Sequence, residues 1–127
     1  MKVTKNFSAS EFDCNDGSLM PEDVMENVIE LAEQLQILRD HIGKPITINS
    51  AYRSKEYNRR IGGVKSSMHI IGKAADLVAS GMSARELNGV IIDLIMSGKM
   101  KEGGVGLYVS KGFVHYDIRG TRARWRK

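Results

Sequence analysis

The longest regular pattern in the sequence is an apolar stripe between Pro21 and Ile42, and it restricts the chain to folds that include one long amphipathic helix. Six apolar residues recur there at steps of three and four, which is the spacing of one helix face. Pro21 suits the first helical position, Glu22 and Asp23 favour the positive end of the helix dipole, and Gly43 and Pro45 end the pattern. The stripe consists of Val24, Val28, Leu31, Leu35, Leu38 and Ile42.

Shorter patterns predict further helices and a set of strands. Apolar runs and alternating patterns predict strands over residues 46–50, 74–78, 104–108 and 112–118. Capping-box spacings at Ser8–Glu11 and Ser83–Glu86 predict a short helical turn and a helix that closes near Gly98. A short helix is expected over 54–60, and residues 64–73 are expected to form a loop. Helices and strands are mixed without regular alternation, which favours an α+β fold: a small antiparallel sheet with helices packed on one side.

Size and composition limit the class of protein. The 127 residues match one domain with one core, so a single domain over 1–127 is expected. With 42% hydrophobic and 27% charged residues, the chain is neither disordered nor collagen-like. No apolar run approaches the ~20 residues of a membrane span, and the first residues lack the apolar stretch of a secretion signal. We therefore expect a cytoplasmic protein or one that leaves the cell without a signal peptide.

The cysteine count and the charge distribution add two expectations. Cys14 is the single cysteine, so an internal disulfide is excluded, and we interpret it as a small apolar residue near the surface rather than a nucleophile. The net charge is +4. A basic terminus of this kind attracts phosphate polymers, such as nucleic acid or an anionic cell wall, or is simply solvated. The basic residues near the end are Arg119, Arg122, Arg124, Arg126 and Lys127.

A carboxylate inside an apolar strand is the most unusual local feature. Asp76 lies in the run Ala-Ala-Asp-Leu-Val over residues 74–78. A buried carboxylate is costly unless it is paired or bound to a cation. His69 precedes it by seven residues, in a loop with serines on one side and Gly72 on the other.

A second polar pair lies in the strand predicted over 112–118. Its two-residue period places His115 and Asp117 on one face together with Phe113, about 7 Å apart at their bases and close enough to serve one site. The opposite face is assigned to the core and consists of Val114, Tyr116 and Ile118.

Two histidines and one aspartate form a ligand set that catalytic zinc uses, with a fourth position left for water. The spacing alone does not bring His69 and His115 together. The alternative is a hydrogen-bonded loop histidine, a buried Asp76 that accepts bonds from backbone donors, and a surface histidine on a strand. The third histidine, His41, lies near the end of the long helix, where a cation complements the dipole, and is interpreted as structural.

Several segments resemble one known family. Residues 67–76 read Ser-Met-His-Ile-Ile-Gly-Lys-Ala-Ala-Asp, and the pattern Ser-x-His-x-x-Gly-x-Ala-x-Asp resembles the signature of zinc peptidases that act on bacterial cell-wall peptides. These include D-Ala-D-Ala carboxypeptidases and L-alanyl-D-glutamate endopeptidases. Residues 48–54 are similar to the family's strand that ends in Tyr-Arg-Ser. The segments that resemble its small single-domain branch, found widely in phages, are 7–14, 104–108, 113–120 and 124–125.

The resemblance implies a hedgehog/D-Ala-D-Ala-peptidase-like fold and a Zn²⁺ cofactor with His69, Asp76 and His115 as ligands. Arg53 would bind and orient the substrate, since its planar fork suits a carbonyl or carboxylate, and Ser67 would contact the substrate or support the site. The implied reaction is hydrolysis of an amide bond in peptidoglycan stem peptides or cross-links. The phage-like branch and the lack of a signal peptide suggest a phage lysis enzyme or virion component, present in the host cytoplasm before release to the wall. A monomer is the default expectation. Which bond is cleaved stays open.

One part of the family pattern is missing. Several members carry an acid three residues, or a histidine two residues, before the last ligand; here Gly112 and Phe113 occupy those positions, and neither accepts a proton. Asp117 is our candidate for the base, or it merely orients His115 or pairs with Arg119.

Glu102, in a neighbouring loop, is a weaker candidate for the base. Because of the missing base, the alternative function is a non-catalytic zinc-binding domain that recognises the cell wall or a protein. A specific nucleic-acid module is not expected, because the sequence offers no binding motif and no stacking aromatic beyond Trp125.

Overall fold

A five-stranded sheet forms the centre of the molecule, and the computed structural model describes all 127 residues. In spatial order its strands are β1 (Ile46–Ser50), β2 (Ala74–Ala79), β4 (Phe113–Asp117), β3 (Gly104–Tyr108) and β5 (Ala123–Arg126). Three of the pairings, β1 with β2, β2 with β4 and β4 with β3, are antiparallel, whereas β5 pairs with β3 in parallel. The predicted α+β class is confirmed. The sheet is mixed rather than purely antiparallel, because the chain after β4 returns to run alongside β3.

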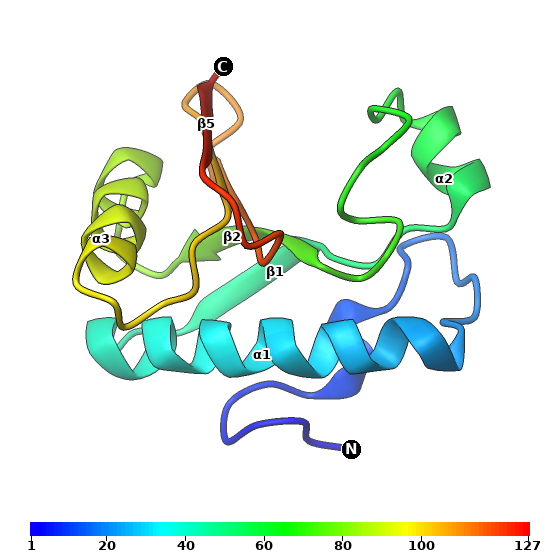
Figure 1. The fold of residues 1–127 in the computed structure, drawn as a ribbon, viewed down its shortest axis with the longest axis horizontal. Coiled ribbons are helices and arrows are strands. Elements are labelled where there is room, and N and C mark those ends of the chain that lie inside the picture. Colours follow the sequence, from blue (N-terminus) through cyan, green and yellow to red (C-terminus); the bar gives the residue numbers. More distant parts are fainter.

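The long helix α1 (Glu22–Ile42) begins and ends as its sequence predicts, apart from its first residue. Pro21 is the capping residue just before the helix, and Gly43 ends it in the left-handed conformation with φ 65°. The helix runs across one side of the molecule, with α3 (Ala84–Met96) beside it and α2 (Lys55–Arg60) near the opposite end (Figure 1). A 3₁₀ turn, η1 (Ala9–Phe12), follows the predicted capping spacing, and the Ser8 amide donates to Glu11 Oε2.

The two faces of the sheet differ in what they carry. One face contributes alternate residues of β2, β3 and β4, together with Ile46 of β1, to a single cluster of 25 buried residues that also includes the apolar stripe of α1 and the inner face of α3. In β4 these are Val114 and Tyr116, as predicted. The alternate positions, among them Asp76 and His115, face the other side. The sheet therefore separates the core from the polar residues that the sequence singled out.

The end of the chain and Cys14 differ from the sequence-based expectations. No strand was predicted after residue 118, yet β5 lies there, and Arg119 and Arg124 form ion pairs with acidic residues rather than a free basic tail. Cys14 is not near the surface: it is 3% exposed and belongs to the core cluster.

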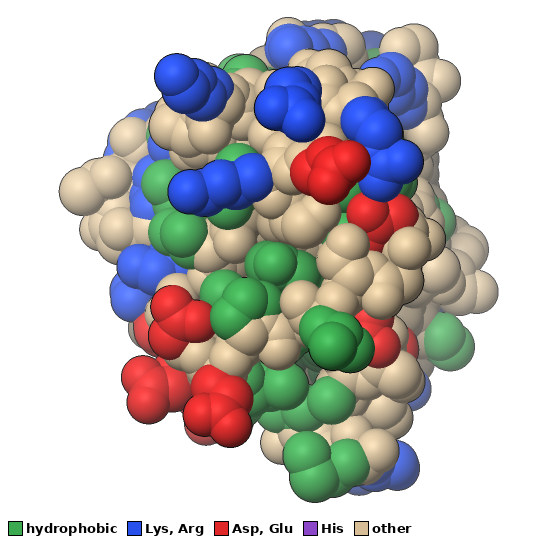
Figure 2. Space-filling model, turned by 90° about the vertical axis from the view of Figure 1, so that its right-hand side faces the viewer, with side chains coloured by type: hydrophobic (Ala, Val, Ile, Leu, Met, Phe, Trp, Pro, Cys, Tyr) green, Lys and Arg blue, Asp and Glu red, His purple; other side chains and the backbone are tan.

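No helix in the structure is long and apolar enough to span a membrane, as expected. On the face that carries α2, most of the Lys and Arg side chains lie above the Asp and Glu side chains (Figure 2). The α2 helix contributes Lys55, Arg59 and Arg60 to the basic side chains, whereas the first turn of α1 is acidic through Glu22 and Asp23.

Candidate metal centre

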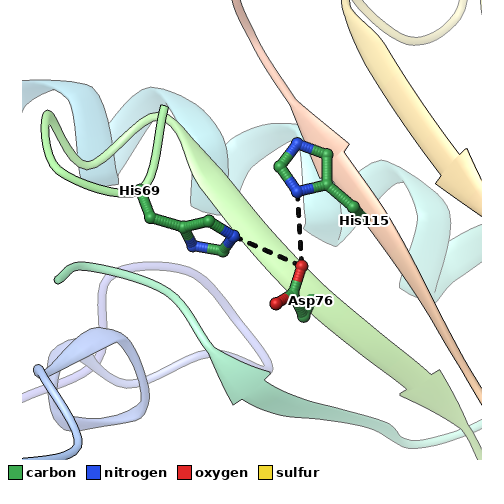
Figure 3. A group of neighbouring side chains, drawn as sticks. All are labelled: His69, Asp76 and His115. Atoms are coloured by element: carbon green, nitrogen blue, oxygen red, sulfur yellow. Dashed lines mark ion pairs between the residues drawn. The ribbon is translucent and has the colours of Figure 1, made fainter. Parts of the chain in front are cut away.

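Three side chains that lie far apart in the sequence meet on the polar face of the sheet. Asp76 of β2 and His115 of β4 are cross-strand partners, and His69 comes from the loop before β2 (Figure 3). Oδ1 of Asp76 lies 3.3 Å from Nε2 of His69 and 3.3 Å from Nδ1 of His115. One ligand atom from each residue lies within 4.8 Å of the other two, and all three residues are buried. The structure thus brings together the three residues that the motif resemblance implies as ligands.

Hydrogen bonds to the outer nitrogens fix how the two imidazoles face Asp76. Nδ1 of His69 lies 2.7 Å from the Ala51 carbonyl, so this nitrogen carries the hydrogen and donates. Nε2 of His115 lies 2.7 Å from Oδ2 of Asp117 and donates in the same way. In each neutral ring the other nitrogen then presents its lone pair towards Asp76. Partners of this type also orient histidine ligands in metal sites.

The spacing and chemistry of these atoms fit a zinc ion. Two lone pairs that face a carboxylate oxygen repel it unless a proton or a cation lies between them. Zinc bonds of about 2.0–2.2 Å in a tetrahedron place ligand atoms about 3.3–3.6 Å apart, which agrees with the observed 3.3 Å separations. Nitrogen from histidine and oxygen from aspartate are both ligands that zinc accepts.

The surroundings favour the protonation states that a metal requires of Asp76 and His69, and oppose the one that it requires of His115. Burial lowers the pKa of His69, because it disfavours the imidazolium more than Asp76 stabilises it. Burial opposes ionisation of Asp76, but hydrogen bonds from the facing nitrogens of His115 and His69, when these are protonated, outweigh it and hold the pKa of this carboxyl below its ordinary value. Burial also disfavours the charged form of His115, yet the hydrogen bonds to Asp117 and Asp76 raise its pKa. The site therefore combines an ionised aspartate with a neutral His69.

Arg53 is tied to the second oxygen of Asp76. Its NH2 group lies 3.2 Å from Asp76 Oδ2, its Nε donates to Ser50 Oγ and its NH1 to Asn58 Oδ1. These bonds use three of the five N–H groups of the guanidinium. Arg53 also lines the cleft above the metal centre, so its remaining two N–H groups are available there.

Asp117 is held from several directions and has no contact with solvent. Its two oxygens accept bonds from His115 Nε2, from the Gly104 amide, and from the backbone and guanidinium of Arg119. Gly104 permits this contact, because a Cβ at that position would lie 2.3 Å from Oδ2 of Asp117. The side chain is 0% exposed. This geometry supports the interpretation that Asp117 orients His115, and it gives no path for the carboxylate to reach a substrate.

Glu102 and the two positions before His115 add no proton acceptor to the site. Glu102 pairs with Arg124 at 2.8 Å and is absent from the lining of the cleft. Gly112 lies in the turn before β4, with φ 75°, and Phe113 stacks on Tyr108. Asp76 is the single carboxylate among the side chains that line the cleft.

A cleft of about 850 Å³ opens over the three side chains. Ser67 lies at its wall, where its Oγ accepts a bond from the His69 amide and so supports the loop. The lining also includes Trp125, whose ring centroid lies 4.9 Å from that of His115. The ring lies over Gly106, where a Cβ would approach it to 2.3 Å.

Analysis of the sequence did not assign Trp125 to the site. The available signal was the alternation of Ala123, Arg124, Trp125 and Arg126, which has the two-residue period of a strand.

Comparison with known proteins places these features in a family context. Residues 5–117 match the family model described as Peptidase M15. A zinc D-Ala-D-Ala carboxypeptidase from Streptomyces albus G is 36% identical over 80 residues, which cover 58% of this chain and 31% of that protein. The peptidoglycan L,D-endopeptidases MepK from Escherichia coli (strain K12) and Shigella flexneri are each 31% identical over 102 residues, which cover 75% of this chain and 52% of theirs. The chain thus spans about half or less of the length of these curated relatives.

Proposed function

Because this chain belongs to the peptidase M15 family, we propose that it is a zinc-dependent peptidase that hydrolyses an amide bond in peptidoglycan stem peptides or cross-links. The observation that carries the proposal is the cluster of His69 Nε2, Asp76 Oδ1 and His115 Nδ1 at the base of an open cleft. The names of the similar proteins, a zinc carboxypeptidase and peptidoglycan endopeptidases, support the same substrate class.

In this proposal His69, Asp76 and His115 hold the zinc ion. Zinc bound there supplies an activated water, with a pKa near 7, and polarises the scissile carbonyl. The chain's own contribution is to keep both imidazole lone pairs directed into the site through Ala51 and Asp117. Because these partners are buried, the ligand geometry is set before a substrate arrives.

Arg53 and Ser67 are the proposed substrate-binding residues. Two N–H groups of Arg53 are uncommitted, and a planar guanidinium binds a carbonyl or carboxylate well. The hydroxyl of Ser67 accepts a bond from the backbone and keeps its own proton available to donate. Asp117, by contrast, is proposed as a positioning residue for His115.

A second candidate function is a zinc-binding domain without catalysis that recognises the cell wall or a protein. The observation that favours it is the absence of a carboxylate other than Asp76 in the cleft, because family members that carry an acid or histidine before the last ligand have a proton acceptor there. Zinc content alone does not separate the two candidates, whereas the chemical fate of peptidoglycan does.

Two finer parts of the proposal rest on narrower support. The motifs resemble the small phage-type branch, which supports an endolysin-like role or a virion component, with the protein in the host cytoplasm before release. The second part is that the protein acts as a monomer.

The test is digestion of purified peptidoglycan by the zinc-loaded protein, with the released fragments identified by mass spectrometry. We expect new peptide ends that a chelator abolishes and added zinc restores. The substitutions His69→Ala, Asp76→Ala and His115→Ala should each reduce both zinc content and fragment release to background. His41→Ala, which changes an exposed histidine at the end of α1, is the matched control and should retain both.

A zinc-replete His69→Ala protein with full activity would contradict the assignment of the ligands. Intact peptidoglycan after incubation with the zinc-loaded protein would favour the binding domain instead.

A further inference from the structure

A second pocket, of about 520 Å³, lies between α2 and the loop that follows it. Three of its lining residues are basic: Lys55 and Arg59 come from α2, and Lys65 comes from the loop. We refer to this cavity as the α2 pocket. None of the residues assigned above to the metal centre or to substrate binding lines it. The remaining lining residues are Asn58, Gly63 and Ile70.

The loop after α2 separates the α2 pocket from the cleft. Val64 and Ser66 line the cleft, whereas Lys65 between them lines the α2 pocket, and Gly63 is the one residue that belongs to both. Asn58, which is 2% exposed, ties this loop to α2, because its Nδ2 donates to the Val64 carbonyl. The two cavities therefore lie on opposite sides of one anchored segment, and a ligand of the α2 pocket would not occupy the metal centre.

The protein leaves the positive charge of the α2 pocket without a counter-charge. Lys55, Arg59 and Lys65 are exposed, and none of them takes part in an ion pair. No Asp or Glu lines the pocket. Glu56, the acidic residue of α2, lies outside the lining and forms no ion pair with these cations.

The spacing of the cations is unfavourable unless an anion lies between them. Lys55 and Arg59 are four residues apart in α2, which places their Cβ atoms about 5–6 Å apart on one face, and like charges at this spacing destabilise a helix. Lys65 brings a third positive charge to the same cavity. Basic side chains also gather over the upper part of the face that carries α2 (Figure 2). An anion in the pocket would offset this repulsion.

The mixture of cations and the absence of aromatic residues indicate which anion fits. A phosphate group offers three oxygens and up to two negative charges, so it can meet a guanidinium fork and two ammonium groups together, whereas a carboxylate has two oxygens and one charge. Sites for single-stranded nucleic acid add aromatic side chains on which bases stack, and no aromatic residue lines the pocket. Ile70 and the lysine stems suit the carbon chain of a sugar or polyol.

We propose that the α2 pocket binds the phosphate group of a sugar or polyol phosphate. This site goes beyond the proposed peptidase activity and does not depend on it. The same chemistry, a phosphate on a hydroxylated carbon chain, occurs in small monoesters and in phosphodiester chains, so the test includes one probe of each kind.

The test follows binding to the ¹⁵N-labelled, zinc-loaded protein by the shifts of its amide signals. The probes are glycerol 3-phosphate, a monoester, and glycerophosphoglycerol, a diester. A thymidine dinucleotide with a single phosphodiester represents nucleic acid, and glycerol and sodium chloride at matched ionic strength are the blanks. The amides of Lys65 and Ile70 report the α2 pocket, whereas the indole N–H of Trp125, the single tryptophan, reports the cleft.

We expect at least one glycerol phosphate to give saturable shifts of the Lys65 and Ile70 amides, with no shift of the Trp125 indole and none from the blanks. Tighter binding of the monoester or of the diester identifies the source of the phosphate. In Lys55→Gln/Lys65→Gln the affinity should fall about tenfold, because each exposed ion pair contributes up to about fivefold. Arg59→Lys keeps the charge but loses the planar fork and should bind several-fold more weakly.

The matched control is Lys5→Gln/Lys99→Gln, which removes the same charge from two exposed lysines outside the pocket and should leave the affinity unchanged. An equal loss of affinity in both double variants would overturn the proposal, because net charge would then explain the binding. Shifts confined to the Trp125 indole, or no saturable shift at all, would also overturn it. Tighter binding of the thymidine dinucleotide than of glycerophosphoglycerol would refute the assignment to a sugar or polyol phosphate.

Discussion

Replacing Asp117 by asparagine tests how far the candidate metal centre depends on a residue that does not belong to it. All the partners of this carboxylate are donors. A carboxamide keeps the shape of the side chain but replaces one acceptor oxygen by an NH₂ group. The NH₂ group must therefore face at least one donor, and the question is which one.

The environment of each oxygen decides the orientation. Oδ1 accepts bonds from the Gly104 amide and from the amide and Nε of Arg119, and none of these groups can become an acceptor. Oδ2 faces His115 Nε2 and Arg119 NH2, and the histidine can switch its tautomer. We therefore expect the NH₂ group to face His115, whose Nδ1 then carries the hydrogen and points towards Asp76.

This tautomer cannot bind a metal through Nδ1. Loss of an outer partner of a metal-binding histidine typically weakens metal affinity by about 10- to 100-fold, and we expect Asp117→Asn to fall in this range. The substitution also removes the negative charge next to Arg119. Breaking a buried pair costs about 3–5 kcal/mol in the free energy of unfolding. The Arg119 side chain is 29% exposed and regains hydration, so we expect about 3 kcal/mol.

Zinc affinity is measured by competition with a chromophoric chelator, the tautomer by the ¹⁵N shifts of the imidazole rings, and stability by chemical denaturation. Asp93→Asn is the matched control, because Asp93 is exposed on α3 and its carboxylate has no partner. It should change neither zinc affinity nor stability. If Asp117→Asn binds zinc as tightly as the wild-type protein, the argument that Asp117 sets the tautomer of His115 is wrong.

Two further substitutions test contacts around the site. Gly106→Ala would place a Cβ 2.3 Å from the Trp125 ring, so we expect a loss of about 1–3 kcal/mol in the free energy of unfolding and a shifted tryptophan emission. The control is Gly89→Ala, where a Cβ meets no atom within 4 Å. Unchanged emission in Gly106→Ala would contradict the packing of Trp125 on Gly106. The hydrogen bond from Arg124 lowers the pKa of Glu102 in the folded protein. The bond therefore stabilises the fold at pH values above the ordinary glutamate pKa of about 4.3, and this contribution is lost as the pH falls through the lowered pKa of the folded state. Wild-type protein should therefore be more stable than Glu102→Gln at pH 7, by less than about 1 kcal/mol for this partly exposed pair, and equally stable at pH 2. A difference that persists at pH 2 in urea titrations would refute the assignment.

Most of the fold follows from patterns that are local in the sequence. The stripe of α1, the capping spacing before α3 and the alternation in β4 depend on residues a few positions apart, and the structure has these elements within one or two residues of the predicted bounds. The strand β5 was not predicted because it has four residues and pairs in parallel with a strand that it does not follow directly. Cys14 was misplaced because its polar neighbours say nothing about the core that closes over it.

The candidate site required information that no local pattern contains. Asp76 and His115 are 39 positions apart and meet because β2 and β4 pair in one particular register. A shift of that register by one residue would turn His115 away from Asp76 and into the core. Spacing alone therefore left His69 and His115 apart, and the motif resemblance supplied what the alternation in each strand could not.

Asp76 and Asp117 show that a buried carboxylate in a strand can have either of two roles. Both are buried at polar-face positions of paired strands, and burial penalises both charges. For Asp117 the compensation comes from His115 Nε2 and from groups that are donors in every state, a guanidinium and backbone amides, so a cation next to it would meet repulsion. For Asp76, two of the compensating partners are imidazole nitrogens whose hydrogens are committed elsewhere. Arg53 compensates Oδ2 of Asp76, but Oδ1 faces two imidazole lone pairs and has no donor until a cation joins it. This difference in partners separates a metal ligand from a positioning residue.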